Sequence, residues 1–196
     1  MSWLETVAVA FGIISVYLSV RQNIWSWPTA IVNVLLYFLV FRDAKLYADM
    51  GLQLVYFVLS VYGWYEWLFG GKNRTQLKVS RLANRTGVIL IAIVVVGVAS
   101  LGTLLSKSTD AALPWLDSLT TSTSLAAQWM MTRKILENWA VWMAVDVVYV
   151  GMFIFKGLFA TAGLYAVFFV LATIGHAQWK RSYRTESPAT VPVQLS

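Results

Sequence analysis

The sequence predicts an all-α integral membrane protein with seven transmembrane helices, organised as a 3+1+3 parallel internal repeat. Three observations predict this class. Of the 196 residues, 59% are hydrophobic and only 12% are charged, whereas a soluble domain averages about 25% charged residues. The apolar residues gather into runs long enough to cross a hydrocarbon layer about 30 Å thick, which takes roughly 20 residues of helix. Finally, two long stretches of the chain resemble each other.

The polar breaks between the apolar runs place the helices along the chain. The predicted helices span residues 4–20, 25–41, 48–69, 87–106, 112–131, 138–155 and 158–179. The run at 87–106 is almost wholly aliphatic, so we expect it to face lipid and to act as a linker. We expect residues 1–181 to form a single transmembrane transporter domain and residues 182–196 to form a disordered cytoplasmic tail.

The internal repeat sets the arrangement of the helices. Residues 3–67 align with residues 115–179 without a gap, at an offset of 112 residues. The identical pairs include Trp3/Trp115, Arg21/Arg133, Trp27/Trp139, Tyr37/Tyr149, Gly63/Gly175 and Trp67/Trp179. Because the linker helix returns the chain across the membrane, both three-helix units have the same orientation. Parallel repeats of this kind are a transporter arrangement, with the substrate held near the midplane between the halves.

The net charge is +6, and the distribution of the basic residues between the two sides predicts the orientation in the membrane. One side holds 11 basic residues, namely Arg21, Lys72, Arg74, Lys78, Arg81, Arg85, Arg133, Lys134, Lys180, Arg181 and Arg184, and the other holds 4, namely Arg42, Lys45, Lys107 and Lys156. The positive-inside rule then places the N-terminus outside and the C-terminus in the cytoplasm. Cytoplasmic loops explain the charge, so no nucleic-acid partner is expected. Trp64, Trp67 and Trp179 lie near helix ends, where an aromatic belt at the membrane interface is expected.

The composition argues against enzymatic chemistry. There is no Cys, and a lone His176 cannot build a multi-histidine metal centre. The sequence shows no Gly-rich phosphate loop and no Ser-His-Asp set. We therefore expect no enzyme activity, no metal and no cofactor. A membrane-embedded enzyme and a scaffold or receptor subunit remain as the alternatives to a transporter.

Polar side chains inside a bilayer are costly, so they are candidates for the substrate site. Trp139, Trp142, Asp146 and Tyr149 follow the spacing i, i+3, i+7 and i+10, which places them on one stripe of the sixth helix. Asp146 is the only acid well inside any predicted span. Its carboxylate could serve as a counter-ion for a cation, as a proton relay or as an acceptor in helix packing, and an aromatic face beside it could hold a cation or a flat ring.

The other candidates are amides and hydroxyls on four helices. They are Asn33, Tyr37, Gln53, Tyr56, Thr121, Ser124, Gln128 and Asn138. Buried amides and hydroxyls form oriented hydrogen bonds to a polar ligand. They also pair across helices or bond to their own backbone, so helix packing is the alternative role for each of them.

Longer patterns in the sequence resemble a known family. The stretch Glu137–Gly151, continuing through Phe155–Leu158 to Leu164, Tyr165 and Gly175, closely resembles the PnuC family of nicotinamide riboside transporters. The segments Trp25–Pro28 and Leu46–Gln53 resemble the first half of the same family, and the similarity covers residues 3–181. The resemblance implies a fold similar to that of SWEET sugar transporters, assembly as a homotrimer, and a location in the lipid bilayer of a bacterial inner membrane.

The resemblance also implies a substrate and a mechanism. Nicotinamide riboside would cross by facilitated diffusion with alternating access, and cytoplasmic phosphorylation would trap it. Its pyridinium ring suits the Trp faces, and its carboxamide and ribose suit the amides and hydroxyls. Relatives of the family carry thiamine or riboflavin, so the identity of the vitamin stays open at this point.

Overall fold

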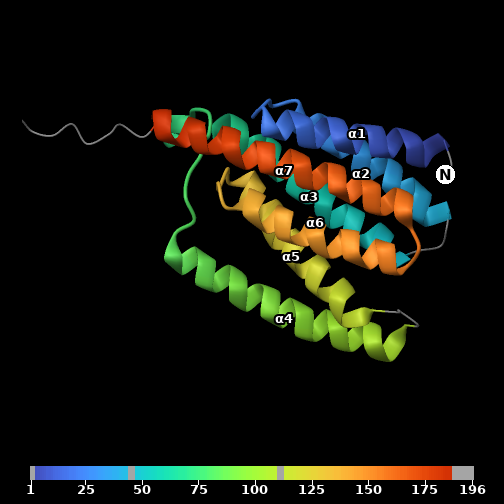
Figure 1. Ribbon diagram of the computed structural model, residues 1–196. Coiled ribbons are helices and arrows are strands. Elements are labelled where there is room, and N and C mark those ends of the chain that lie inside the picture. The colour runs from blue at the N-terminus through green and yellow to red at the C-terminus, as the bar shows by residue number, and fades with distance from the viewer. Residues whose placement is uncertain (1–2, 44–46, 110–112, 187–196) are drawn as a thin grey trace, which may run out of the picture.

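The computed structural model describes residues 3–43, 47–109 and 113–186, and their regular structure is helical apart from one isolated β-bridge (Figure 1). The helices are α1 (Trp3–Val20), α2 (Ser26–Asp43), α3 (Tyr47–Phe69), α4 (Asn84–Ser108), α5 (Pro114–Thr132), α6 (Asn138–Phe155) and α7 (Phe159–Glu186), with a short 3-10 helix, η1 (Lys72–Arg74), before α4. The predicted all-α class with seven long helices is therefore confirmed.

The last helix is longer than the apolar run predicts. Residues 182–186, which we expected in a disordered tail, continue α7. Tertiary contacts explain the extension: Gln22 Nε2 donates a hydrogen bond to Ser182 Oγ at 2.8 Å, and Tyr183 packs against the hydrophobic core. Residues 187–196, the remainder of the predicted tail, lie outside the described residues.

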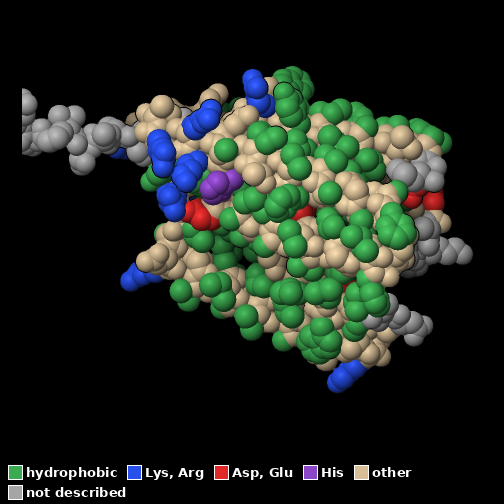
Figure 2. Space-filling model, viewed as in Figure 1, with side chains coloured by type: hydrophobic (Ala, Val, Ile, Leu, Met, Phe, Trp, Pro, Cys, Tyr) green, Lys and Arg blue, Asp and Glu red, His purple; other side chains and the backbone are tan. Residues whose placement is uncertain are grey.

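Successive helices run in opposite directions, so α1, α3, α5 and α7 share one direction and α2, α4 and α6 the other (Figure 1). Three connections, residues 21–25, 70–83 and 133–137, therefore lie at the same end as the C-terminal turns of α7. Most of the Lys and Arg side chains visible in Figure 2 gather at this end. We call it the basic end.

Four of the helices in the described residues are long and apolar enough to cross a membrane by themselves: α1, α4, α6 and α7, the last over Phe159–Thr185. The other three, α2, α3 and α5, carry most of the candidate amides and hydroxyls. Helix α4 packs against α5 and leaves most of its aliphatic side chains exposed, including Val88, Ile91 and Val96. This exposure fits the predicted lipid-facing linker.

Contacts within the first three-helix unit recur 112 residues later in the second. The rings of Trp27 and Trp67 meet edge to face at 5.3 Å and 88°, and those of Trp139 and Trp179 meet at 5.4 Å and 90°. The turn after α1 has a positive φ of 54° at Gln22, and the turn after α5 has 48° at the equivalent Lys134.

The two units also contact each other reciprocally. Helix α1 packs against α7, and α3 packs against α5. Because α1 is equivalent to α5 and α3 is equivalent to α7, these are the same contact with the two units exchanged. The core of the molecule forms where they meet, near the basic end, around Trp27, Trp67, Trp139 and Trp179. This exchange of equivalent contacts is the pattern that a two-fold relationship between the units produces.

The core location corrects one expectation about the tryptophans. Trp67 is 2% exposed and Trp179 is fully buried, so neither belongs to an aromatic belt. Trp64, at 38%, is exposed at the surface as expected. A Trp near a helix end can face lipid or a neighbouring helix, and only the packing of the two units decides between them.

The connection between α3 and α4 is attached to the second unit. Ser80 N donates to Lys134 O at 3.0 Å, and Leu136 N donates to Ser80 O at 2.9 Å. The carboxylate of Glu137 accepts a hydrogen bond from Leu82 N at 2.8 Å and pairs with Arg81. The segment 77–82 therefore covers the core at the basic end.

Candidate functional site

A cavity of about 410 Å³ lies between the two three-helix units. Helices α1, α2 and α3 of the first unit and α5, α6 and α7 of the second all contribute side chains to its wall. Small-molecule sites in proteins typically measure about 300–1,000 Å³. The cavity therefore has the size and the place expected of a transporter's substrate site.

The predicted stripe on α6 faces this cavity. Trp139, Trp142, Asp146 and Tyr149 all line it, as their spacing predicts. Asp146 is only 3% exposed. It makes no hydrogen bond or ion pair with any residue that the structure describes, so no neighbouring hydroxyl uses it as a packing acceptor.

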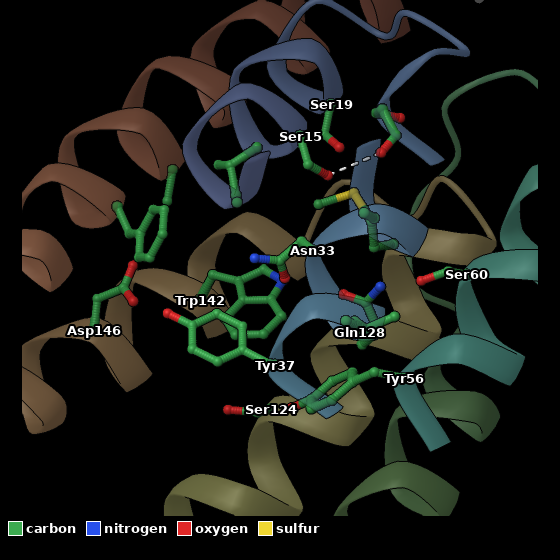
Figure 3. Close-up of a pocket in the computed structure, with 18 of the residues that line it drawn as sticks. Ser15, Ser19, Asn33, Tyr37, Tyr56, Ser60, Ser124, Gln128, Trp142 and Asp146 are labelled. Carbon is green, nitrogen blue, oxygen red and sulfur yellow. Dashed lines mark hydrogen bonds between the residues drawn. The ribbon is translucent and has the colours of Figure 1, made fainter. Parts of the chain in front are cut away.

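The amides on the other helices also line the cavity. Asn33, Gln53 and Gln128 belong to its wall. Asn33 Nδ2 donates a hydrogen bond to Ala8 O at 2.6 Å, which holds the amide in place and leaves its Oδ1 as an acceptor. Figure 3 shows Asp146 at one side of the cavity and Gln128 at the other.

A group of hydroxyls completes the polar wall. Tyr37, Tyr56 and Ser124 line the cavity. Ser124 is buried and lies next to the hydroxyls of Tyr56 and Tyr149. Hydroxyls can donate or accept, so this group can adapt to either kind of polar atom on a ligand.

Two predicted site residues do not line the cavity. Asn138 is fully buried where α6 begins, and its Nδ2 donates to Ile135 O at 2.6 Å, so the side chain stabilises the turn before the helix. Thr121 shares a helical face with Gln128 but lies about 10 Å away along α5. Residues on a shared helical face point in the same direction, but they can lie at different depths along the helix axis.

The structure adds wall residues that the sequence analysis did not select. They include Ser15, Ser19, Ser26, Ser60, Trp27 and Tyr165. Ser15 Oγ donates to Ser26 O at 2.9 Å, the bond drawn as a dashed line in Figure 3. Two signals were available in the sequence: Ser15 and Ser19 are four residues apart in an otherwise apolar run, and Tyr165 occupies the position equivalent to Gln53.

The tryptophan core closes the cavity at the basic end. Trp27 and Trp139 belong to the wall, and Trp67 and Trp179 pack against them at the core. A polar contact between the units reinforces the closure, because Arg133 bonds the Tyr62 hydroxyl at 3.0 Å and pairs with Glu66 at 3.1 Å. The hydrogen bond to Tyr62 raises the pKa of Arg133 further above its ordinary value, so this residue stays charged.

The charge of the cavity restricts its ligand. Among the described residues of its wall, none is Lys, Arg or His, and Asp146 is the one carboxylate. The described residues also contain no group of three His, Cys, Asp or Glu side chains that could hold a metal ion. A wall of this kind offers flat rings, amides, hydroxyls and one acid, and it offers no cation for a phosphate.

Comparisons with known proteins agree with this architecture. The family model described as "Nicotinamide mononucleotide transporter" matches residues 2–181. The curated "Nicotinamide riboside transporter PnuC" of Escherichia coli is 26% identical over 209 residues, covering 94% of this chain and 87% of that protein. The "Riboflavin/roseoflavin transporter RibM" of Streptomyces davaonensis is 29% identical over 194 residues, covering 95% and 89%.

A solved structure is similar in fold as well. The "Crystal structure of the Vitamin B3 transporter PnuC" aligns with a TM-score of 0.74 and 27% sequence identity. The alignment covers 95% of this chain and 84% of that one. The helices described above therefore follow an arrangement already seen in a membrane transporter.

Proposed function

Because the chain belongs to the PnuC family of vitamin transporters, we propose that it carries nicotinamide riboside across a bacterial membrane. The observation that carries the proposal is the composition of the cavity wall. It offers aromatic faces and amides, and none of its described residues is a cation. The riboside has an aromatic ring, a carboxamide and uncharged hydroxyls, whereas the mononucleotide adds a phosphate for which the described residues of this wall offer no cationic partner.

Different wall residues contact different parts of the ligand. The face of Trp142 stacks on the pyridinium ring, which cation–π attraction favours. Gln53, Gln128 and the free Oδ1 of Asn33 hydrogen-bond the carboxamide and the ribose hydroxyls. Ser124, with Tyr56 and Tyr149 beside it, supplies further donors and acceptors.

Transport proceeds by alternating access between the two three-helix units. The units rock about the two-fold axis between them, and the tryptophan core at the basic end separates when the cavity opens to that side. Transport is coupled neither to ATP nor to a proton gradient in this mechanism, so the process is facilitated diffusion. Phosphorylation in the cytoplasm then traps the vitamin, because the described residues of the cavity wall include no cation to compensate the charge of the phosphorylated product.

The protein takes a defined orientation and assembly in this proposal. The basic end faces the cytoplasm, which places the N-terminus outside and the C-terminus inside the inner membrane. The protein is a homotrimer and has no enzyme activity of its own. The exposed aliphatic side chains of α4 are then in contact with lipid or with a neighbouring copy.

Riboflavin is the second candidate substrate. It is favoured by the similarity to RibM, which covers 95% of this chain. Thiamine is a third possibility on chemical grounds, because it is also a flat aromatic cation. Riboflavin differs from the other two in charge, and all three differ in size and shape, so direct binding separates them.

The test measures binding and flux with purified protein. Isothermal titrations use nicotinamide riboside, its mononucleotide, thiamine and riboflavin, and counterflow of labelled riboside is followed in proteoliposomes. The variants are Trp142→Ala in the cavity and Trp64→Ala as a matched control, since Trp64 lies at the surface of α3. We expect saturable binding and exchange of the riboside, both lost in Trp142→Ala and kept in Trp64→Ala.

Other results would overturn parts of the proposal. Tight binding of thiamine or riboflavin in place of the riboside would keep the transporter and change its substrate. Binding without exchange would indicate a receptor or scaffold, and conversion of the vitamin by purified protein would indicate an enzyme.

A further inference from the structure

The basic end is closed by two contacts between the units, α3 with α5 and α1 with α7, and among the described residues only the first contains an ion pair. Where α3 meets α5, Arg133 bonds the Tyr62 hydroxyl at 3.0 Å and pairs with Glu66 at 3.1 Å. The side chain of Glu66 is 12% exposed, so water screens this pair less than it screens a pair at an open surface. A charged contact therefore joins the two units at this side.

The internal repeat shows that the other side is built without this contact. The residue equivalent to Arg133 is Arg21, and the tyrosine and the glutamate are replaced by Ile174 and Gln178. Arg21 is exposed and makes no ion pair with any residue that the structure describes. Equivalent helices therefore meet through a charged contact on one side of the basic end and through neutral contacts on the other.

The turns after α1 and α5 show the same difference. Lys134 Nζ lies 4.5 Å from the centre of the Trp67 ring, so a cation–π contact joins the turn after α5 to the end of α3. The equivalent residue after α1 is Gln22, whose Nε2 donates a hydrogen bond to Ser182 Oγ on α7 at 2.8 Å. Lys134 Nζ also lies 3.5 Å from Gln22 Oε1, between the two turns. The cation thus adds to the α3–α5 side, and its neutral equivalent serves the α1–α7 side.

A segment of backbone further ties α3 to α5. In the segment 77–82, Leu77 N donates to Trp67 O of α3 at 3.2 Å, and the backbone N–H and C=O of Ser80 both bond the turn after α5. Val79 is 6% exposed and belongs to the hydrophobic core. Within the described residues, no such segment bridges α1 and α7. The α3–α5 side is therefore held by charge, by backbone hydrogen bonds and by a buried side chain.

We propose that the basic end opens on one side only, with α1 parting from α7 while α3 and α5 stay packed and act as the hinge. The inference rests on the proposed function, because it describes how the proposed alternating access opens the cavity. Parting α3 from α5 would leave Glu66 and Arg133 without partners, which is costly for partly buried charges. Parting α1 from α7 breaks hydrogen bonds between neutral groups, which water can replace.

The route on this side runs between the ends of α1 and α7. Ser19 of α1 and Ala172 of α7 both line the cavity. Trp179 Nε1, further along α7, bonds Ser19 O at 3.0 Å. When α1 moves away from α7, this bond and the bond from Gln22 to Ser182 break, and the cavity becomes continuous with the basic end.

Two pairs of cysteines test which side moves, because the chain has no Cys of its own. Gln22→Cys with Ser182→Cys replaces a contacting pair on the α1–α7 side. Glu66→Cys with Arg133→Cys replaces a contacting pair on the α3–α5 side. A short bifunctional thiosulfonate reagent bridges each pair in the full-length protein, and intact mass confirms the bridge. Counterflow of labelled nicotinamide riboside is then measured in proteoliposomes before bridging, with the bridge intact, and after dithiothreitol cleaves it.

The expected result is an effect of one bridge only. The bridge between α1 and α7 stops exchange, and dithiothreitol restores it. The bridge between α3 and α5 leaves the exchange rate equal to that of the same variant before bridging. Inhibition by the α3–α5 bridge, or full exchange with the α1–α7 bridge in place, would overturn the inference.

A second measurement needs no ligand. Ser19 and Met131 occupy equivalent positions, both line the cavity, and they are similarly buried, at 8% and 6% exposure. A bulky maleimide should label Ser19→Cys faster than Met131→Cys, because position 131 stays packed at the hinge, where its carbonyl accepts the Trp67 hydrogen bond. Equal or slower labelling of Ser19→Cys would contradict the inference. If the wild type exchanges no riboside while the labelling difference is present, the proposed function fails and the one-sided opening stands.

Discussion

Trp67 and Trp179, which occupy equivalent positions 112 residues apart, pack against each other across the boundary between the two units, with ring centroids 5.8 Å apart. Each ring also reaches into the opposite unit. Trp67 Nε1 donates a hydrogen bond to Met131 O at 3.1 Å, and Trp179 Nε1 donates to Ser19 O at 3.0 Å. Met131 occupies the position equivalent to Ser19. The same hydrogen bond, from a Trp ring to a backbone carbonyl of the opposite unit, therefore forms twice and closes the basic end.

This relationship predicts matched effects of two substitutions. Trp67→Phe and Trp179→Phe each keep an aromatic ring and remove one buried N–H donor, which should lower the free energy of unfolding by about 0.5–1.5 kcal/mol each. Thermal unfolding in detergent measures the loss. Trp64→Phe is the control at the surface of the same helix as Trp67 and should change little. Unequal effects of the two core substitutions would contradict the reciprocal arrangement.

Two equivalent glycines allow the tryptophans to approach the helices. A Cβ at Gly63 would lie 2.3 Å from the ring of Trp27, and one at Gly175 would lie 2.7 Å from the ring of Trp139. Gly63→Ala and Gly175→Ala should therefore each cost about 1–3 kcal/mol through overpacking. Gly51→Ala on the same helix as Gly63 is the matched control, because a Cβ there meets nothing within 4 Å. Thermal unfolding again provides the measurement, and full stability of Gly63→Ala would contradict the packing.

The segment that covers the core at the basic end should respond to loss of its anchor. Glu137→Ala removes the acceptor of Leu82 N and the partner of Arg81. The exposed ion pair adds little to global stability, so the expected change is local. Limited trypsin digestion should cut faster at Lys78 and Arg81 while the melting temperature stays near that of the wild type. Asp43→Ala, which removes a surface ion pair with Arg42, should leave the digestion unchanged.

Two substitutions separate the contribution of the Trp142 π face from that of the volume that the side chain fills. Trp142→Phe keeps a smaller aromatic face and should weaken riboside binding less than Trp142→Leu, which fills the space without a π face. Cation–π attraction is worth up to about 2 kcal/mol when desolvated, so the leucine variant should lose roughly 30-fold in affinity. Titration with the riboside measures both. Equal binding by the phenylalanine and leucine variants would show that Trp142 acts through volume alone.

The helices and the site stripe follow from the sequence because they depend on local patterns. Apolar runs of membrane length placed α1 to α6 within a few residues of their observed bounds. The spacing of Trp139, Trp142, Asp146 and Tyr149 predicted one face of α6, and all four residues lie in the wall of the cavity. The predicted 112-residue offset likewise reappears in the paired tryptophan contacts.

Other features depend on which helix faces which, and a local pattern does not carry that information. The spacing of Ser15 and Ser19 places both on one face of α1, but it does not say whether that face meets the cavity or a neighbouring helix. A buried amide can bond a ligand or its own turn, and Asn138 bonds Ile135 O.

The sequence by itself determined the seven helices, the repeat and the polar stripe, because each is a periodicity along the chain. Only the tertiary structure decided that Trp67 and Trp179 form the core, that α7 continues to Glu186, and that Asp146 faces a cavity without a cationic partner among the described residues. The physical reason is the same in each case. These outcomes depend on the surface that the opposite unit presents, and that surface exists only once the two units have packed together.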